Sequence, residues 1–184
     1  MRGHVIICGI AGSLREKSFN GALLRAAQGL VPAGVELRIF DLLGELPHYN
    51  SDLEVGEGPE PVAALRRAIG TADALLIATP EYNYSIPGVL KNAIDWASRP
   101  VTDSVLKKKP TALMGASGGI MGTVRGQLAL RQSLHCTETH VLLKPEVYIG
   151  KAQEKFDAEL VLTDEATRTH IQKLVEALVS AVRA

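Results

Sequence analysis

Three features are scarce in this 184-residue chain: cysteines, long apolar runs, and an excess of charge of either sign. The two cysteines, Cys8 and Cys136, do not form a CxxC pair, which argues against a dithiol or metal site. No apolar run approaches the roughly 18 residues of a transmembrane helix, and no signal peptide opens the chain. We therefore expect a cytoplasmic protein with no membrane partner.

The charge balance excludes a further class of function. Twenty basic residues balance twenty acidic residues, so the formal net charge at pH 7 is zero. Proteins that bind nucleic acid broadly carry a clustered excess of lysine and arginine, and the single basic run, 107–109, is typical of a solvated loop. We expect no nucleic-acid partner. The five histidines lack HExxH or other ligand spacing, so no metal site is predicted.

The chain does contain a regular alternation of short apolar runs with segments of helical periodicity. The first run is continuous, which is typical of a strand buried on both faces. Strands are predicted at 4–10, 35–40, 74–79, 111–116 and 141–143, with 147–149 as a candidate part of the fifth. Helices are predicted at 21–30, 61–71, 88–97, 127–134 and 164–182, and a long irregular loop at 41–59.

Strict alternation of strands and helices predicts one α/β domain over residues 1–184, built on a parallel sheet with right-handed crossovers. Five strands favour a flavodoxin-like three-layer sandwich with strand order 2-1-3-4-5 over a six-stranded dinucleotide-binding sheet. Ligands of such sheets bind beyond the carboxyl ends of the strands, here between strands one and three. The loops after strands one, three and four should therefore carry the function.

The loop after the first strand, 9–20, has the residues of a phosphate site. Gly12 suits a tight turn, and the loop precedes a helix N-terminus, where free N–H groups and the helix dipole favour an anion. Arg15 can form paired hydrogen bonds with phosphate oxygens, and Ser13, Ser18 and Asn20 can each donate one. The loop matches neither GxxxxGK[ST] nor GxGxxG. Helix capping by Ser18 or Asn20 is the alternative interpretation.

The loop after the third strand, 79–88, is unusually apolar for a loop. It contains Tyr82, Tyr84, two prolines and an isoleucine, which are costly to leave in water. These side chains could wall a flat ring, with Asn83 and backbone N–H groups addressing its polar edge. A packed turn or a subunit contact is the alternative. Trp96, on the next predicted helix, is expected in the core or at a subunit interface.

The loop after the fourth strand, 117–122, contains three glycines, which let the backbone approach a ligand and turn N–H groups toward negative charge. A competing interpretation exists, because 115–119 also fits the G-x-S-x-G nucleophile elbow with Ser117 as the nucleophile. That elbow should run directly into a helix, and Gly122 and Gly126 delay it here. Nearby Arg125 and Arg131 could meet an anionic nucleotide, although surface ion pairing is the simpler interpretation.

Two long blocks of the sequence resemble the NADPH-dependent FMN reductase family. Residues 12–20 are similar to the family pattern GSLR-x-x-S-x-N, and residues 79–96 to TPEYN-x-S-x-PG-x-LKNA-x-DW. The likeness continues through the loop at Ser117 and through 143–146, so it covers most of the chain. Within the family, the chain is similar to bacterial quinone and chromate reductases. Residues 120–125 fall in a stretch that varies across the family, which leaves the acceptor open.

The resemblance implies bound FMN, NADPH or NADH as electron donor, a flavodoxin-like fold, and a homodimer or homotetramer. It also implies three groups of binding residues, with no catalytic side chain beyond the flavin. The FMN phosphate would be held by Ser13, Arg15, Ser18, Phe19 and Asn20. The ribityl chain and ring would lie along Pro80, Glu81, Tyr82, Asn83 and Tyr84. The far side of the ring would meet Ser117, Gly118 and Gly119.

The implied reaction passes a hydride from NAD(P)H to FMN and then to a quinone or a similar small acceptor, in a ping-pong cycle on one shared site. Chromate is a further candidate acceptor. Two alternatives remain at this point. One is a flavodoxin-type electron carrier, which the zero net charge weakly disfavours because such carriers are usually acidic. The other is a serine hydrolase that uses Ser117.

Overall fold

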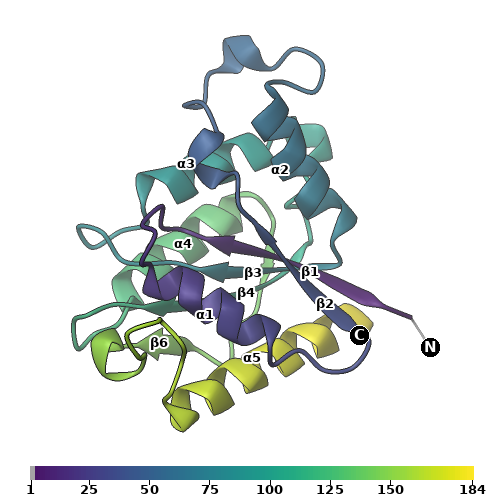
Figure 1. Ribbon diagram of the computed structural model, residues 1–184. Helices are drawn as coiled ribbons and strands as arrows, with labels where there is room; N and C mark the ends of the chain where they lie inside the picture. Colours follow the sequence, from purple (N-terminus) through teal and green to yellow (C-terminus); the bar gives the residue numbers. More distant parts are fainter. Residues whose placement is uncertain (1–2) are drawn as a thin grey trace.

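A parallel sheet in the order β2-β1-β3-β4-β5 forms the centre of the computed structural model, which describes residues 3–184 (Figure 1). The predicted strand order is therefore confirmed. The strands are β1 (Val5–Ala11), β2 (Val35–Phe40), β3 (Ala74–Ala78), β4 (Pro110–Ala116), β5 (His140–Val141) and β6 (Val147–Ile149).

The fifth position of the sheet is shared by two short strands, and 147–149, predicted as a candidate part of the fifth strand, is one of them. β5 and β6 both pair with β4, with Pro110 opposite His140 and Met114 opposite Val147. The predicted strand 141–143 is shortened to a two-residue pairing at 140–141. Pro145 lies between the two pieces and has no N–H to donate to the ladder, which is typical of an interrupted edge strand.

Helices cover both faces of the sheet and complete the three layers. α1 (Phe19–Gln28) and α5 (Glu165–Arg183) pack on one face, and α2 (Glu60–Thr71), α3 (Gly88–Ala97) and α4 (Val124–Cys136) on the other. Val5 and Ile7 of β1 join the core on the α1 side, whereas Cys8 and Ile10 join the core on the α2 side. This alternation explains why the first strand is a continuous apolar run. Burial also raises the pKa of the Cys8 thiol to about 12.

Two of the helices that border the loops begin earlier than the sequence predicts. α1 begins at Phe19 rather than at residue 21, because Ser18 caps it. α4 begins at Val124 rather than at residue 127, although Gly126 lies in its first turn. By contrast, α3 begins and ends at the predicted residues.

The segment 41–59 is irregular as predicted, apart from two short 3₁₀ turns at Leu43–Glu45 and Ser51–Leu53. It forms the projection at the top of Figure 1 and is fastened to α3. The Tyr49 N–H donates to the Asn92 amide oxygen at 2.8 Å, and the Trp96 indole N–H donates to the Pro47 carbonyl at 2.8 Å. Trp96 is only 1% exposed, so it belongs to the core and gives no support to a subunit interface.

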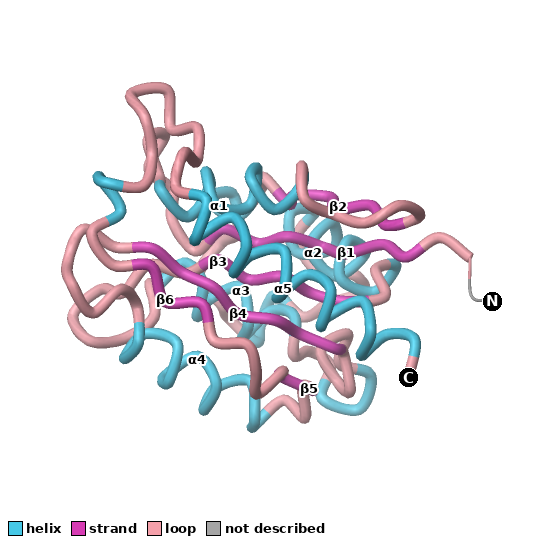
Figure 2. Tube along the Cα trace, turned by 90° about the horizontal axis from the view of Figure 1, so that it is seen from below, coloured by secondary structure: helices cyan, strands magenta, loops and turns pink. Residues whose placement is uncertain are grey.

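The carboxyl ends of β1, β3 and β4 lie at one end of the sheet, and the described chain ends lie at the other (Figure 2). The loops predicted to carry function therefore gather at the end away from both termini. Of the helices described between residues 3 and 184, none is both long enough and apolar enough to cross a membrane. The cytoplasmic location stays a prediction.

Candidate functional site

The loops after β1, β3 and β4 surround an open cleft of about 310 Å³ at the carboxyl ends of these strands. This volume falls at the lower end of the range for small-molecule sites, about 300–1,000 Å³. The structure brings together all the predicted site residues except Asn83, Tyr84 and Gly119, and adds Ala116. The cleft is lined by Ser13, Arg15, Ser18, Phe19, Asn20, Pro80, Glu81, Tyr82, Ala116, Ser117 and Gly118.

The N-terminus of α1 faces this cleft with a neutral cap. The Ser18 hydroxyl oxygen accepts hydrogen bonds from the N–H groups of Asn20 (3.2 Å) and Gly21 (3.3 Å). A serine that accepts in this way still has its own hydroxyl hydrogen to donate. The first turn of α1 contains no acidic residue. The helix end therefore keeps its positive potential, and both predicted roles of Ser18, capping and anion binding, are compatible.

Arg15 and Ser13 complete the donor side of the cleft. The exposed Arg15 guanidinium has no hydrogen-bond or ion-pair partner within residues 3–184. The Ser13 hydroxyl oxygen accepts from the Arg15 N–H at 3.4 Å and lies 3.4 Å from the Tyr82 hydroxyl. Gly12 allows this loop to approach the loop after β3, because a Cβ at this position would lie 3.2 Å from Thr79 Oγ1 and 3.4 Å from Pro80 Cδ.

Asn20 plays a larger structural part than the sequence indicates. Its buried side-chain amide donates to the Ala116 carbonyl at 3.0 Å and accepts from the Ala116 N–H at 2.9 Å. These two bonds fasten the start of α1 to the end of β4. One Nδ2 hydrogen is left for the predicted phosphate contact.

The loop after β3 forms a tight hairpin. Tyr82 and Ser85 exchange two backbone hydrogen bonds of 3.0 Å, and the residues between them, Asn83 and Tyr84, have φ values of 50° and 65°. Positive φ at both central positions is the signature of a type I′ turn. Tyr84 is 70% exposed. Pro80 and Tyr82 line the cleft, while the tip of the hairpin does not.

Glu81 also differs from the simple expectation of a ring-lining residue. Its side chain is only 7% exposed, and its carboxylate accepts from the N–H groups of Arg125 (2.9 Å) and Gly126 (3.1 Å) in the first turn of α4. It also pairs with the Arg125 guanidinium at 2.6 Å. Glu81 therefore caps α4 from a neighbouring loop. Sequence reasoning missed this role because no local pattern joins residues 44 positions apart.

The loop after β4 contributes backbone to the cleft. The Ser117 N–H donates to the Ile149 carbonyl at 2.9 Å, so this N–H cannot face a ligand as predicted. Within the described chain, the N–H groups of Gly118 and Gly119 have no acceptor and remain available. A Cβ on Gly115 would lie 2.1 Å from Thr123 Oγ1, so the first glycine of G-x-S-x-G is required by packing.

The hydrolase alternative finds no support in this geometry. The Ser117 hydroxyl donates to the Gly122 carbonyl at 2.6 Å, and no histidine among residues 3–184 hydrogen-bonds to it. α4 begins only at Val124, so the serine does not stand at a sharp strand-to-helix turn.

The donor set of the cleft suits an anionic mononucleotide such as FMN. Hydroxyls, a guanidinium and a helix N-terminus line this cleft together with Tyr82 and the backbone of the glycine-rich loop. Glu81 is the single carboxylate that lines the cleft, and Arg125 and the α4 N–H groups neutralise it. An anion at α1 therefore meets uncompensated positive charge from Arg15.

Comparison with known proteins agrees with this chemistry. The family model for NADPH-dependent FMN reductase matches residues 5–154. The chain belongs to this family. It is 49% identical over 183 residues to an NAD(P)H-dependent FMN reductase of Pseudomonas aeruginosa, covering 100% of this chain and 98% of that protein. It is 41% identical over 174 residues to a quinone reductase of Pseudomonas putida, covering 95% of this chain and 92% of that protein.

A solved structure gives the same result. FerB, a flavoenzyme NAD(P)H:(acceptor) oxidoreductase of Paracoccus denitrificans, superposes with a TM-score of 0.88 at 38% identity and 97% coverage of each chain. The predicted family, enzyme class, flavodoxin-like fold, FMN cofactor and NAD(P)H donor are therefore confirmed.

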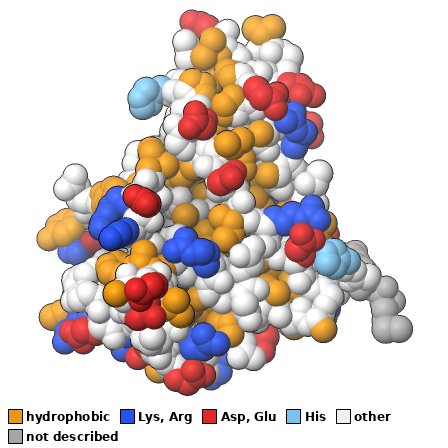
Figure 3. All heavy atoms as spheres, viewed as in Figure 1, with side chains coloured by type: hydrophobic (Ala, Val, Ile, Leu, Met, Phe, Trp, Pro, Cys, Tyr) orange, Lys and Arg blue, Asp and Glu red, His pale blue; other side chains and the backbone are white. Residues whose placement is uncertain are grey.

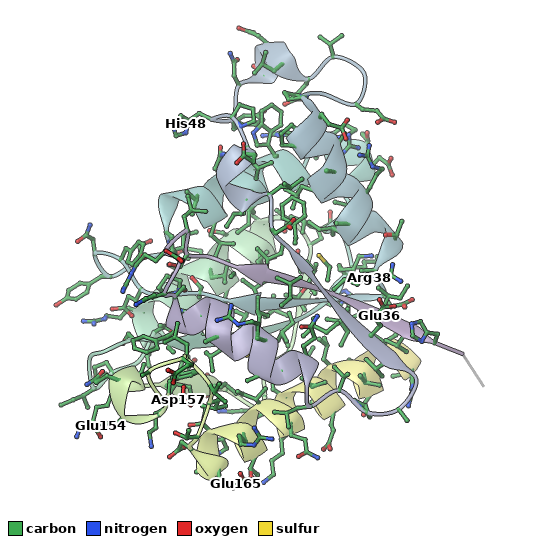
Figure 4. All side chains as sticks on the ribbon, viewed as in Figure 1. Glu36, Arg38, His48, Glu154, Asp157 and Glu165 are labelled. Carbon is green, nitrogen blue, oxygen red and sulfur yellow. The ribbon has the colours of Figure 1, made fainter. Side chains whose placement is uncertain are left out.

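Charged groups elsewhere on the surface do not form a competing site. The pKa of Glu36 is lowered to about 2, chiefly by hydrogen bonds from Arg38 and then from His4. Glu36 and Arg38 lie together on the edge strand β2, and all three side chains are exposed (Figure 4). On the face shown in Figure 3, basic and acidic side chains are interspersed. No group of acidic, histidine or cysteine side chains that could hold a metal occurs within the described residues.

Proposed function

We propose that this chain is an FMN-dependent NAD(P)H oxidoreductase that reduces a quinone or a similar small acceptor in a ping-pong cycle. The observation that carries the proposal is the convergence of Arg15, Ser18 and the N-terminus of α1 on a cleft that Tyr82 and the glycine loop also line. Family membership supports the reductase class, and the names of the relatives favour quinones as acceptors.

The phosphate end of the cofactor would be held by the hydroxyl of Ser18, the guanidinium of Arg15 and the hydroxyl of Ser13. Asn20 would keep α1 in place against β4 while its second Nδ2 hydrogen faces the phosphate. The flat end of the cofactor would lie against Pro80 and Tyr82 on one side and the Gly118 backbone on the other. Bound FMN supplies the redox chemistry, because it can take a hydride from NAD(P)H and give it to an acceptor.

The chain's own groups would act by placement and electrostatics. The N–H group of Gly118, which lines the cleft, would donate a hydrogen bond toward negative charge on the ring, and no backbone reorganisation is needed because neighbouring bonds fix the loop. Lys151 N–H donates to the Gly119 carbonyl at 3.0 Å and Ala152 N–H to the Ser117 carbonyl at 3.0 Å. One cleft serving both substrates requires that the oxidised donor leaves before the acceptor enters.

An electron carrier of the flavodoxin kind is the second candidate, and a kinetic experiment separates the two. The protein should be yellow as purified, and stopped-flow mixing with NADPH or NADH should bleach the flavin absorbance rapidly. Steady-state rates with benzoquinone should then give parallel double-reciprocal lines. Absence of bleaching with both donors would contradict the reductase proposal, and intersecting lines would contradict the ping-pong order.

We also infer a homodimer or homotetramer. Support comes from the large apolar side chains left exposed around the cleft, namely Tyr84, Ile120 and Met121, since patches of this kind commonly mark interaction surfaces. Light scattering after size-exclusion chromatography should give a mass of two or four chains. A monomer at micromolar concentration would contradict this inference.

A further inference from the structure

The hairpin after β3 and the first turn of α4 are joined by a set of contacts that the reductase chemistry does not itself require. We call Glu81, Tyr84, Arg125 and Gly126 the latch. The Glu81 carboxylate accepts two backbone hydrogen bonds from α4 and pairs with the Arg125 guanidinium at 2.6 Å. The same guanidinium carbon lies 3.8 Å from the centroid of the Tyr84 ring, a cation–π contact. Arg125 thus contacts the residue that precedes the hairpin and a residue at its tip.

Gly126 makes this close approach possible. A Cβ at this position would lie 3.2 Å from the Ser85 carbonyl oxygen and 3.3 Å from Glu81 Cα and Cβ. Such distances are shorter than ordinary van der Waals contacts, so any larger residue would push the hairpin away from α4. The glycine in the first turn of α4 is therefore explained by the neighbouring hairpin and not by its own helix, where glycine is less favourable than alanine.

The hairpin needs stabilising contacts from outside its turn, because the turn is strained. Tyr84 has φ of 65°, which a bulky side chain rarely adopts. Single residues in this region are conformationally strained and persist where the surroundings fix them. The surroundings here are the two Tyr82–Ser85 backbone bonds and the Arg125 contact.

We propose that Glu81 and Arg125 are positioning residues that hold the hairpin in its binding conformation before any ligand arrives. They would couple the loop after β3 to the first turn of α4, so that Tyr82 is already in place as one wall of the flavin cleft. This inference rests on the proposed function, because the wall matters only if a flavin lies against it. It gives Glu81 and Arg125 no contact with the reacting atoms.

The proposal makes two separable expectations. Without the latch, the hairpin should open more often in the ligand-free protein. This first expectation does not depend on flavin binding. FMN would then have to order the hairpin that carries Tyr82 when it binds. This ordering should weaken the affinity for FMN, although the phosphate contacts at α1 are unchanged. A purely structural role for the helix cap would lower stability everywhere and leave the affinity for FMN unaltered.

The experiment measures amide hydrogen exchange in the ligand-free protein and the FMN dissociation constant by flavin fluorescence. The variants are Arg125→Ala and Glu81→Gln. Lys91→Ala is the matched control, because it removes an ion pair of 2.7 Å on α3 that touches no part of the latch. We expect exchange of the Tyr82 and Ser85 amides to rise at least about tenfold and the FMN dissociation constant about tenfold in both latch variants. The control should change neither by more than about twofold.

A second pair of variants distinguishes the loss of the latch contacts from a general folding defect. Gly126→Ala keeps every charge and adds one methyl group against the hairpin. It should therefore raise both the exchange rates of the Tyr82 and Ser85 amides and the FMN dissociation constant. Arg125→Lys keeps the ion pair but loses the planar contact with Tyr84, so it should restore part of the affinity lost in Arg125→Ala.

The outcomes are distinguishable. If the wild-type protein does not bind FMN, the proposed function fails, while the exchange measurement still tests the latch. If the wild type binds FMN and the latch variants bind it equally well, the positioning role is overturned. Unchanged exchange of the Tyr82 and Ser85 amides in Arg125→Ala would overturn it as well.

Discussion

The two helices that begin beside the cleft are capped in opposite ways. α1 is capped by the neutral Ser18 and has no acidic residue in its first turn. α4 is capped by the Glu81 carboxylate, which reaches it from the loop after β3. The positive end of α1 is thus left open to a ligand, and the positive end of α4 is satisfied within the protein. The contrast supports our proposals that the anion of the cofactor binds at α1 and that α4 supports the hairpin.

The largest effect is expected when α1 is given a carboxylate cap, which removes the difference between α1 and α4. Ser18→Asp should still cap the helix, because aspartate is among the best N-cap residues. It removes a donor to phosphate and adds a negative charge, so we expect the FMN dissociation constant to rise about 1,000-fold, which is about 4 kcal/mol. Fluorescence titration measures the affinity, and thermal unfolding of the ligand-free protein checks the cap. Equal FMN affinity in the variant would contradict the assignment of α1.

The next largest effect should be a loss of stability on substitution of Gly115, near the end of β4 that leads toward α4. Gly115→Ala would place a methyl group 2.3 Å from the Thr79 carbonyl oxygen and 2.1 Å from Thr123 Oγ1. Overpacking of this kind costs about 3 kcal/mol of unfolding free energy. Urea denaturation measures it. Gly70→Ala is the control, since its new methyl group would make only an ordinary contact of 3.6 Å with Val105; similar losses in both would show that the site is not tightly packed.

A smaller effect is expected from the free cation at α1. Arg15→Ala should raise the FMN dissociation constant about 30-fold, near 2 kcal/mol, which is typical of a hydrogen bond to a charged group. The measurement is the same fluorescence titration. Lys17→Ala, which removes an exposed charge from the same loop, should change affinity by less than about threefold. An equal loss in both variants would indicate only general electrostatic attraction.

The smallest effect tests a third helix, whose carboxylate cap faces no cleft. Asp164 caps α5, with Glu165 in the same first turn (Figure 4). Its pKa is lowered to about 2, first by the hydrogen bond from Lys155 and then by those from Thr167. A lowered pKa means that the charged cap stabilises the fold above about pH 4, the ordinary value for aspartate. This contribution fades as the pH falls toward 2.

Asp164→Asn should therefore have a lower midpoint of thermal unfolding than the wild type at pH 7, and the difference should shrink between pH 4 and the lowest pH at which the protein is folded. Calorimetry at several pH values measures it. A difference that grows on acidification would contradict the sign of this shift. FMN affinity at pH 7 should not change, which distinguishes a carboxylate cap on α5 from one placed on α1.

The contrast between α1 and α4 also shows what the sequence could and could not predict. The phosphate side is encoded in one contiguous stretch, so Ser18, Arg15 and the helix start could be recognised together. The strands could be located from their buried apolar runs, and their number and alternation with helices predicted the strand order. The residue pair that supports the hairpin, Glu81 and Arg125, could not be recognised, because it joins a loop to a helix that only the folded sheet brings together.

Two further differences have the same physical origin. Gly126 looks like a helix breaker in isolation, and α4 begins before it only because Glu81 caps the first turn from another loop. Asn20 looks like a simple donor, and its pairing with Ala116 depends on α1 meeting the end of β4. Local patterns predict what a loop can bind, whereas tertiary contacts decide which of its groups are free to do so.

The central claim is that the phosphate of the cofactor binds at the N-terminus of α1. The most direct test is to compare the affinities of the wild-type protein for FMN and for riboflavin, which has the same ring and no phosphate. We predict that FMN binds at least about 100-fold more tightly, and that Arg15→Ala narrows this ratio by weakening FMN alone. Equal affinity for the two flavins would contradict the claim.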